Sequence, residues 1–350
     1  MTDENETLIS AKPRIRINGN ARADIDQAIL FMRINLPFSG MSHAELRLVN
    51  WGVTDDAGES GYAFQDVVHG DQIEISAGES SEPPLFIGDI TAVEEVYGQG
   101  APRLVLLMED GLHKLAKQRN SRVFDSVSVN DLVQTVLSDA NLSGEIQVSS
   151  DTGVFHQLNE TNLAFLQRIL RPYDIALRNQ SGSLQVKAEE RDAQPVDVDT
   201  QSGVSLLRIT ADLNHQYLSA QVKGFNLEAD EETDASENDV QNESGETAKQ
   251  LLTNLSWGSD DLLVYPFSRN QSEASAWATA EFRKKSGEFL SGELVISGNA
   301  KLRTGKQINL SGASTRLNGK YRIVQAQHLF DTTAGYKTRV KITRSSWNQN

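Results

Sequence analysis

The side chains that most often catalyse reactions or bind metals are few in this sequence and stand far apart. Its histidines are His43, His69, His113, His156, His215 and His328. No two of them are four residues apart, as two metal ligands on one helix face would be, and none belongs to a recognised catalytic motif. The sequence contains no cysteine, so it offers neither thiolate ligands nor disulfides. The histidines therefore predict structural or surface roles.

Three short segments approach the patterns of ligand-binding loops, but each departs from its motif. Residues 298–306 end in Gly-Lys as a phosphate-binding loop does, yet Gln307 follows where that motif needs Ser or Thr. Residues 98–100 lack the third glycine of a dinucleotide-binding turn, since Arg103 occupies its place. Residues 197–199 lack the glycine on which a calcium loop turns. We expect no cofactor, no metal site and no enzymatic activity.

Length and composition point to an ordinary globular protein. A chain of 350 residues suits two or three domains. No apolar run approaches the ~18 residues of a membrane span, and the polar N-terminus does not resemble a signal peptide. Together with the absence of cysteine, this predicts a protein folded in a reducing cytoplasm without membrane contact. Its formal charge of −15 also makes direct binding of nucleic acid an unfavourable prospect.

Much of the negative charge falls in one segment. Residues 228–246 hold nine acidic side chains and no basic one. Such a block repels itself and buries little, which is typical of a mobile loop. Two interpretations stay open: a solvated insertion, or a loop near a partner or a channel mouth, where it would repel acidic cargo.

The elements that must position these residues form an internal repeat. Each copy consists of a Gly-led strand, a strand with a central glycine, and a Gly-led turn with an alternating strand. The matching segments are 70–76 and 305–311, 86–93 and 317–324, and 100–107 and 335–342. Strands and turns in matching order indicate two copies of one small β-domain. A duplicated domain can imitate two subunits, so three chains would present six equivalent barrels.

Alternation of apolar and polar residues through both copies is typical of antiparallel strands with one buried face. The predicted fold class is therefore β-rich α+β, with two tandem tube-like antiparallel β-barrels and an inserted small α/β module. In that module Ser128 begins one helix with a capping signature, and a second helix spans about 161–171. The predicted domains are a disordered N-terminus (1–12), the first barrel (13–115), the α/β module (116–198), the second barrel (199–227 and 290–346), and an insertion with an acidic loop and an amphipathic helix (228–289).

About residues 15–345 resemble a known family, most specifically at 157–166 (QLNETNLAFL) and 298–321. It is the baseplate-hub family of contractile tails and injection systems, which includes phage late control D proteins, the T-even phage tail hub and the N-terminal hub part of VgrG. The resemblance implies a homotrimer whose duplicated barrels form a pseudo-hexameric ring between a sixfold inner tube and a threefold spike.

The resemblance also implies partners. They are the hexameric inner-tube protein, a trimeric spike and other baseplate proteins, with a tape-measure protein as a further candidate. The sequence ends at Asn350, directly after the second barrel, so we expect the spike to be a separate chain. This favours a phage tail, tailocin or phage-like particle over a type VI effector carrier.

Candidate contacts with a neighbouring subunit or the tube lie on the repeat strands, because unpaired strand edges seek partners. These candidates are Ile73, Ile75, Ile87, Ile90, Val93, Ile308, Leu310, Tyr321 and Ile323. For Gln157, Asn159 and Glu160, two interpretations stay open: a contact with a neighbouring subunit, or capping of the helix that begins near Thr161. The helix with Trp277 and Phe282 is assigned either to the core or to an interface.

One alternative function belongs to a different class, a cell-wall-binding or wall-degrading tail component. The helix at 130–140 within an α/β module gives it slight support. Hydrolysis would need a catalytic carboxylate pair or an activated nucleophile, and the sequence shows neither with usable spacing.

Overall fold

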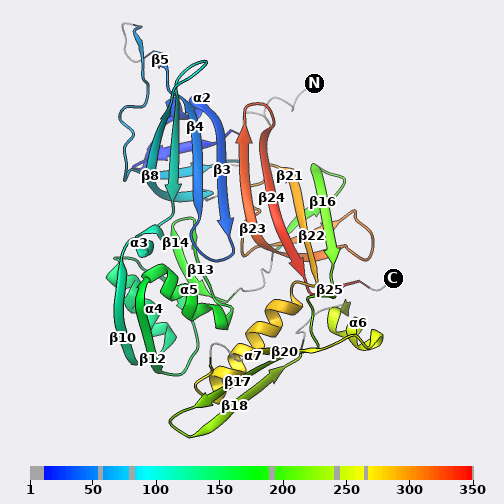
Figure 1. Cartoon of the computed structure of the whole chain (residues 1–350). Helices are drawn as coiled ribbons and strands as arrows, with labels where there is room; N and C mark the ends of the chain where they lie inside the picture. Colours follow the sequence, from blue (N-terminus) through cyan, green and yellow to red (C-terminus); the bar gives the residue numbers. More distant parts are fainter. Residues whose placement is uncertain are drawn as a thin grey trace.

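Strands are the commonest secondary structure, and the largest group of them forms two rolled sheets that stand side by side, with the helices gathered largely at one end (Figure 1). This is the β-rich α+β class that the sequence predicts. The computed structural model describes residues 12–53, 58–78, 83–188, 194–239, 245–263 and 267–348. The segment expected to be disordered lies outside these ranges, apart from Lys12. No helix in the described part of the chain combines the length and the apolar character that crossing a membrane requires.

The first rolled sheet, which we call the first barrel, has the strand order β3-β4-β9-β8-β7-β1. Its strands are β1 (Arg14–Ile17), β3 (Ile29–Pro37), β4 (His43–Val49), β7 (Gln72–Ser76), β8 (Phe86–Val96) and β9 (Arg103–Glu109). Alternation places one face of each strand in the core, where Met32, Leu46 and Leu106 are fully buried. The connections hold β2 (Asn20–Ala21), α2 (Ala23–Ala28) and a hairpin of β5 (Gly52–Val53) and β6 (Ser60–Gly61).

The second barrel has the order β16-β21-β24-β23-β22-β15. Its strands are β15 (Val196–Asp199), β16 (Val204–Ala211), β21 (Leu290–Ser297), β22 (Gln307–Ser311), β23 (Gly319–Asp331) and β24 (Gly335–Arg344). Residues 196–198, which the sequence assigned to the α/β module, belong here because β15 pairs with β22. That pairing is parallel, whereas β1 pairs with β7 antiparallel.

The strand registers show that the two barrels are copies. A bulge at Thr91 in β8 corresponds to one at Val324 in β23. A second pair of bulges lies at Leu30 in β3 and Ser205 in β16. Because bulges interrupt a ladder at defined places, two coincidences establish that β8 corresponds to β23 and β3 to β16.

The glycines that suggested the alignment of the repeats are not equivalent. Ile73 pairs with Gly88, but Ile308, its counterpart, pairs with Tyr321 rather than with Gly319. The sequence alignment of these strands was therefore wrong by two residues. The reason is that each glycine serves a different local need. A Cβ at Gly88 would collide with the carbonyl oxygen of Glu109, whereas Gly319 has a positive φ of 131°.

The two barrels are joined edge to edge. β3 pairs antiparallel with the far half of β23, from Pro37 opposite Gln325 to Phe31 opposite Asp331. This junction unites both barrels in one 13-stranded sheet, and their interiors form one hydrophobic core. Figure 1 shows β3 and β23 as the neighbouring strands at the centre of the molecule.

The α/β module hangs below the first barrel in Figure 1. Its elements are α3 (His113–Ala116), β10 (Arg119–Val127), α4 (Val129–Asp139), β11 (Gly144–Gln147), β12 (Gly153–Thr161), α5 (Asn162–Leu170), the 3-10 turn η1 (Arg171–Tyr173), β13 (Ala176–Gln180) and β14 (Ser183–Lys187). The Ser128 hydroxyl accepts a hydrogen bond from the Asp131 N–H at 3.1 Å, which confirms the predicted cap of α4. Thr161 caps α5 in the same way through the Ala164 N–H.

The insertion differs from its prediction. Its elements are β18 (Glu231–Glu237), β19 (Glu246–Thr247), α6 (Ala248–Leu255), β20 (Asp260–Leu263) and α7 (Gln271–Ser286), while β19 pairs with β25 (Ser346–Trp347). β17 (Ser219–Asn226), expected in the second barrel, instead pairs with β18 and β20. The acidic segment expected to be a mobile loop is a strand over its first part, because Thr233 and Ala235 face inward while acidic neighbours face solvent. Residues 240–244 of that segment lie outside the described ranges.

Helix α7 belongs to the chain's own core. Trp277 is 8% exposed and Phe282 is 2% exposed, which confirms the core interpretation over the interface one. The core is shared with the α/β module rather than with the second barrel. The Tyr173 hydroxyl donates to Oε1 of Glu273 at 3.1 Å, and its ring meets Trp277 edge-on at 6.0 Å between centroids.

Candidate subunit interface

The junction between β3 and β23 shows how this chain joins one barrel to another. On the solvent side, Nε2 of Gln327 donates to Oδ1 of Asn35 at 2.6 Å. On the core side, Ile34 faces His328, and both side chains are fully buried. The Tyr336 hydroxyl lies 2.8 Å from Nδ1 of His328. Burial lowers the pKa of His328 to about 3, so an uncharged imidazole occupies this apolar position at neutral pH.

The same two types of edge are found again, unpaired, elsewhere in the joined sheet. Among the described strands, β16 pairs only with β21, and it is the counterpart of β3. The outer edge of β8 meets β7 only as far as Asp89, and no described strand pairs with it beyond Ile90. That far half of β8 is the counterpart of the part of β23 that β3 covers. Among the described strands, the same two edges that pair within the chain are therefore also present unpaired, one on each barrel.

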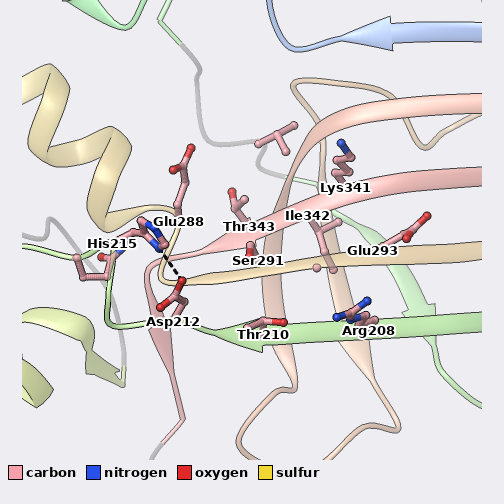
Figure 2. A pocket seen from close by; sticks show the side chains of 13 residues that line it. Arg208, Thr210, Asp212, His215, Glu288, Ser291, Glu293, Lys341, Ile342 and Thr343 are labelled. Atoms are coloured by element: carbon pink, nitrogen blue, oxygen red, sulfur yellow. Dashed lines mark hydrogen bonds and ion pairs between the residues drawn. The ribbon is translucent and has the colours of Figure 1, made fainter.

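The solvent face beside the open β16 edge is polar and hollowed. A depression of about 470 Å³ is lined mainly by residues of β16, β21 and β24, together with Asp212 and His215, which follow β16. Figure 2 shows Arg208 on β16 near Glu293 of β21, with Lys341 of β24 on the same face. Oε1 of Glu293 lies 2.7 Å from Nε of Arg339, with which it forms an ion pair.

The first barrel repeats this arrangement. Its depression of about 300 Å³ contains Glu45, which occupies on β4 the place of Glu293 on β21. Arg33 and Arg47 both hold Glu45, each at 2.6 Å. Each barrel therefore presents a carboxylate held by arginine on its solvent face.

One acid–histidine pair lies in the larger depression. Nδ1 of His215 is 2.7 Å from Oδ2 of Asp212, and this hydrogen bond lowers the pKa of Asp212. The His215 side chain is 82% exposed, and the structure gives no hydrogen bond from it to Ser291 or Thr343, which line the same depression (Figure 2). An activated nucleophile needs such a contact with its base. Nor do any three Asp, Glu or His side chains of the described ranges gather closely enough to hold a metal ion.

A family model described as the Alg8 N-terminal domain matches residues 9–331. The chain belongs to this family. A comparison with curated proteins found no match.

Solved structures share the fold over nearly the whole chain. The 43 kDa tail protein of prophage MuSo2 from Shewanella oneidensis has a TM-score of 0.70 at 12% identity, over 96% of this chain and 99% of that one. The tail protein from Neisseria meningitidis MC58 has a TM-score of 0.68 at 10% identity, over 96% and 97%. The E. coli c3393 protein, described as a component of the type VI secretion system, has a TM-score of 0.61 at 10% identity, over 96% and 79%. This member of the Alg8 N-terminal domain family thus has the fold of phage tail and type VI secretion proteins.

Seven of the nine candidate contacts on the repeat strands lie in the chain's own core. Those at most 1% exposed are Ile73, Ile75, Ile90, Ile308, Leu310, Tyr321 and Ile323. Their side chains are therefore not available to a neighbouring subunit. Ile87 is partly buried against the β13–β14 turn at Gly182. Val93 is partly buried, and of these nine residues it alone lies on the open part of β8.

The second group of candidates holds the corner between β12 and α5. Gln157 is fully buried; its Nε2 donates to Oδ1 of Asn162 at 3.0 Å, and its Oε1 accepts Nε of Arg122 at 2.9 Å. Glu160 forms an ion pair with Arg168 at 3.0 Å.

Asn159 is exposed, with a positive φ of 51°. Gln157 is fully buried in the single chain, so its side chain offers no surface to a neighbouring subunit. The alternative, capping of the helix that begins near Thr161, is carried out by Thr161 itself, while Nε2 of Gln157 donates to the Glu160 carbonyl and to Oδ1 of Asn162.

A structurally important arginine was missed by the sequence analysis. Arg303 is 6% exposed, and its Nη1 donates to the Pro84 carbonyl at 2.9 Å and to the Ser181 hydroxyl at 2.6 Å. Its Nε donates to the Ala300 carbonyl, and Nη2 to the Pro83 carbonyl. Arg303 thereby fastens the second barrel to the first barrel and to the α/β module. The only sequence signal was its place in the segment tested as a phosphate loop.

Proposed function

We propose that this protein is a non-enzymatic structural hub of a contractile phage tail or phage-like injection particle. Three copies form a pseudo-hexameric ring that joins the sixfold inner tube to the threefold spike. The observation that carries this proposal is the edge-to-edge union of two equivalent barrels with the same two edges left open. The fold shared with phage tail proteins supports the assignment to a tail or a tail-like particle.

The arrangement of the edges supports a ring. A contact between two different surfaces of identical chains repeats until it closes into a ring or extends into a fibre. If the rotation between successive barrels is one sixth of a turn, three chains close with six barrels. Open edges are also an aggregation hazard, which closure removes.

The two ends of the molecule would contribute different numbers of units to a three-chain ring. Each chain contributes two barrels but only one α/β module and one insertion, and these lie at one end of the barrels (Figure 1). The barrel end would present six similar units and suits the hexameric inner-tube protein. The end with the module would present three units and suits a separate trimeric spike. Other baseplate proteins and a tape-measure protein are further partners of such a hub, which would be made in the bacterial cytoplasm and built into the particle.

A bridging experiment tests this function. Immobilised spike protein from the same particle should retain inner-tube protein only after this chain is added. Retention of neither partner by the chain, in both orders of addition, would contradict the hub. Hydrolysis of purified cell wall by the chain, or co-sedimentation with it, would instead favour the wall-directed alternative.

A further inference from the structure

We infer that successive copies join through β16 of one copy and the far half of β8 of the next, as antiparallel strands in one fixed register. The inference rests on the proposed ring and specifies the contact that would build it. The occupant of each open edge is thus a second copy of this chain. The argument starts from the β3–β23 junction, which is the same contact made within one chain.

The register follows from the bulges. Asn35 lies five residues after the bulge at Leu30, and Thr210 lies five residues after the bulge at Ser205. Gln327 lies three residues after the bulge at Val324, and Glu94 lies three residues after the bulge at Thr91.

Within the chain, Asn35 faces Gln327. Glu94 of one copy should therefore face Thr210 of the other. Counting along antiparallel strands then places Val96 opposite Arg208, and Val93 opposite Ala211.

The side chains at this junction suit the pairing. Within the chain, the corresponding position carries the Gln327–Asn35 hydrogen bond. Between chains, the Thr210 hydroxyl can donate to the Glu94 carboxylate, and Arg208 is the diagonal neighbour of Glu94, within reach of a long side chain. Glu94, Arg208 and Thr210 are all exposed in the single chain. The contact between chains would therefore be charge-assisted and sensitive to salt, unlike the amide pair inside the chain.

An aromatic cluster marks the same place. Trp51, Tyr62 and Tyr97 stack edge to face, with centroids 5.4 Å and 6.1 Å apart. They are 46%, 38% and 59% exposed, respectively, which is unusual for three neighbouring aromatic side chains. Tyr97 directly follows β8, so the inferred register places it opposite Leu207 of the next copy, beside Leu206, which is 44% exposed.

This cluster is confined to the first barrel. Trp51 and Tyr62 lie in the connection from β4 to β7, which spans residues 50–71, whereas the equivalent connection from β21 to β22 spans only 298–306. The cluster therefore adjoins the junction between chains and has no counterpart at the junction within the chain. It gives the contact between chains an apolar anchor of its own.

Cysteine pairs test the register, because the chain has no cysteine of its own. The variant Glu94→Cys/Thr210→Cys should form disulfides between chains under mild oxidation, giving covalent dimers and trimers on a non-reducing gel. The control Glu94→Cys/Ile209→Cys differs by a one-residue slip, which turns one thiol to the other face of the sheet, and should not cross-link. The variant Asn35→Cys/Gln327→Cys calibrates the geometry, since it should close within one chain.

When the mass of the wild-type particle is measured as well, the cross-linking results test the edge contact and the proposed hub separately. A three-chain particle whose Glu94/Thr210 pair stays reduced, while the Asn35/Gln327 pair oxidises, would overturn the edge contact and leave the hub standing. Open covalent chains longer than three copies would support the contact and refute the closed trimer. A monomeric wild-type chain with no cross-linking at any pair between chains would overturn both.

The aromatic cluster has its own test. Trp51→Ser/Tyr97→Ser should raise the concentration at which the assembly dissociates at least ~10-fold, since buried aromatic anchors dominate such contacts. Both residues are exposed in the single chain, so the melting temperature of the dissociated chain should stay near that of the wild type. An unchanged dissociation concentration would remove the cluster from the junction.

Discussion

Replacing Arg303 with Met should destabilise the fold, because this side chain connects three parts of it. The three guanidinium nitrogens of Arg303 donate to the carbonyls of Pro83, Pro84 and Ala300 and to the Ser181 hydroxyl. These acceptors lie in the first barrel, in the α/β module and in its own loop. Met keeps much of the length and volume but donates nothing, so the substitution tests the hydrogen bonds rather than the packing.

The cost can be worked from burial. Each hydrogen bond to a charged group contributes roughly 1.5–3 kcal/mol net, and a buried acceptor left without its donor costs about 1–3 kcal/mol. Release of the desolvation cost of a buried guanidinium offsets part of this sum. We therefore expect Arg303→Met to lower the free energy of unfolding by about 3 kcal/mol. At an m value of about 3 kcal/mol/M in urea, the midpoint should fall by about 1 M.

A matched control separates burial from the mere presence of an arginine. Arg339 is half exposed and forms a 2.7 Å ion pair with Glu293. Exposed ion pairs contribute about 0–1 kcal/mol, so Arg339→Met should shift the urea midpoint by less than ~0.3 M. Tryptophan fluorescence and circular dichroism should both follow the transition. Equal shifts for the two variants would refute the reasoning that Arg303 fastens three parts of the fold.

Three further predictions concern protonation and helix capping. Burial lowers the pKa of His328 to about 3, so at intermediate pH the unfolded chain binds a proton at this histidine and the folded chain does not. The free energy of unfolding therefore decreases as pH falls from about 6.5 towards 3. His328→Phe should therefore reduce the loss of unfolding free energy between pH 7 and pH 5 by about 2 kcal/mol, and an unchanged loss would count against a neutral buried imidazole. Burial raises the pKa of Asp110 to about 6, so its effect on stability has the opposite pH dependence to that of His328. The stabilisation is fully present below the unfolded pKa of about 3.8 and is lost as pH rises through 6. In urea titrations, Asp110→Asn should therefore make the free energy of unfolding rise more steeply between about pH 4 and pH 6. Thr161→Ala removes the cap of α5 and should cost about 1 kcal/mol at pH 7, whereas Thr161→Ser, which keeps the hydroxyl, should cost little.

The sequence predicted the barrels because alternation is a direct consequence of a strand with one buried face. Ile73 and Ile308 are apolar for that reason, and both are fully buried. The same signal misled the search for contact residues. A side chain that faces a barrel core and one that faces a neighbouring subunit are both apolar on alternate positions, so alternation alone does not distinguish them.

The acidic segment shows why composition can hide a strand. Its charge as a whole indicated a loop, yet Thr233 and Ala235 alternate with outward acidic residues. A strand needs only one face to be buried, and acidic side chains on the other face stay hydrated. The inward residues were too short a pattern to outweigh nine acidic side chains in the sequence.

The open edges could not be read from sequence. Which edges are free depends on the pairing of β3 with β23, whose residues Asn35 and Gln327 are 292 positions apart. No local pattern in either strand indicates that partner. Arg303 was missed for a similar reason, since its acceptors on Pro84 and Ser181 lie 219 and 122 positions away.

The absolute mass of the purified chain, measured by light scattering and followed by top views in negative stain, tests the hub most directly. The account predicts a particle of three 38.5 kDa chains with six lobes around a ring. A chain that remains monomeric at tens of micromolar, and stays so when the spike protein of the same particle is added, would contradict it.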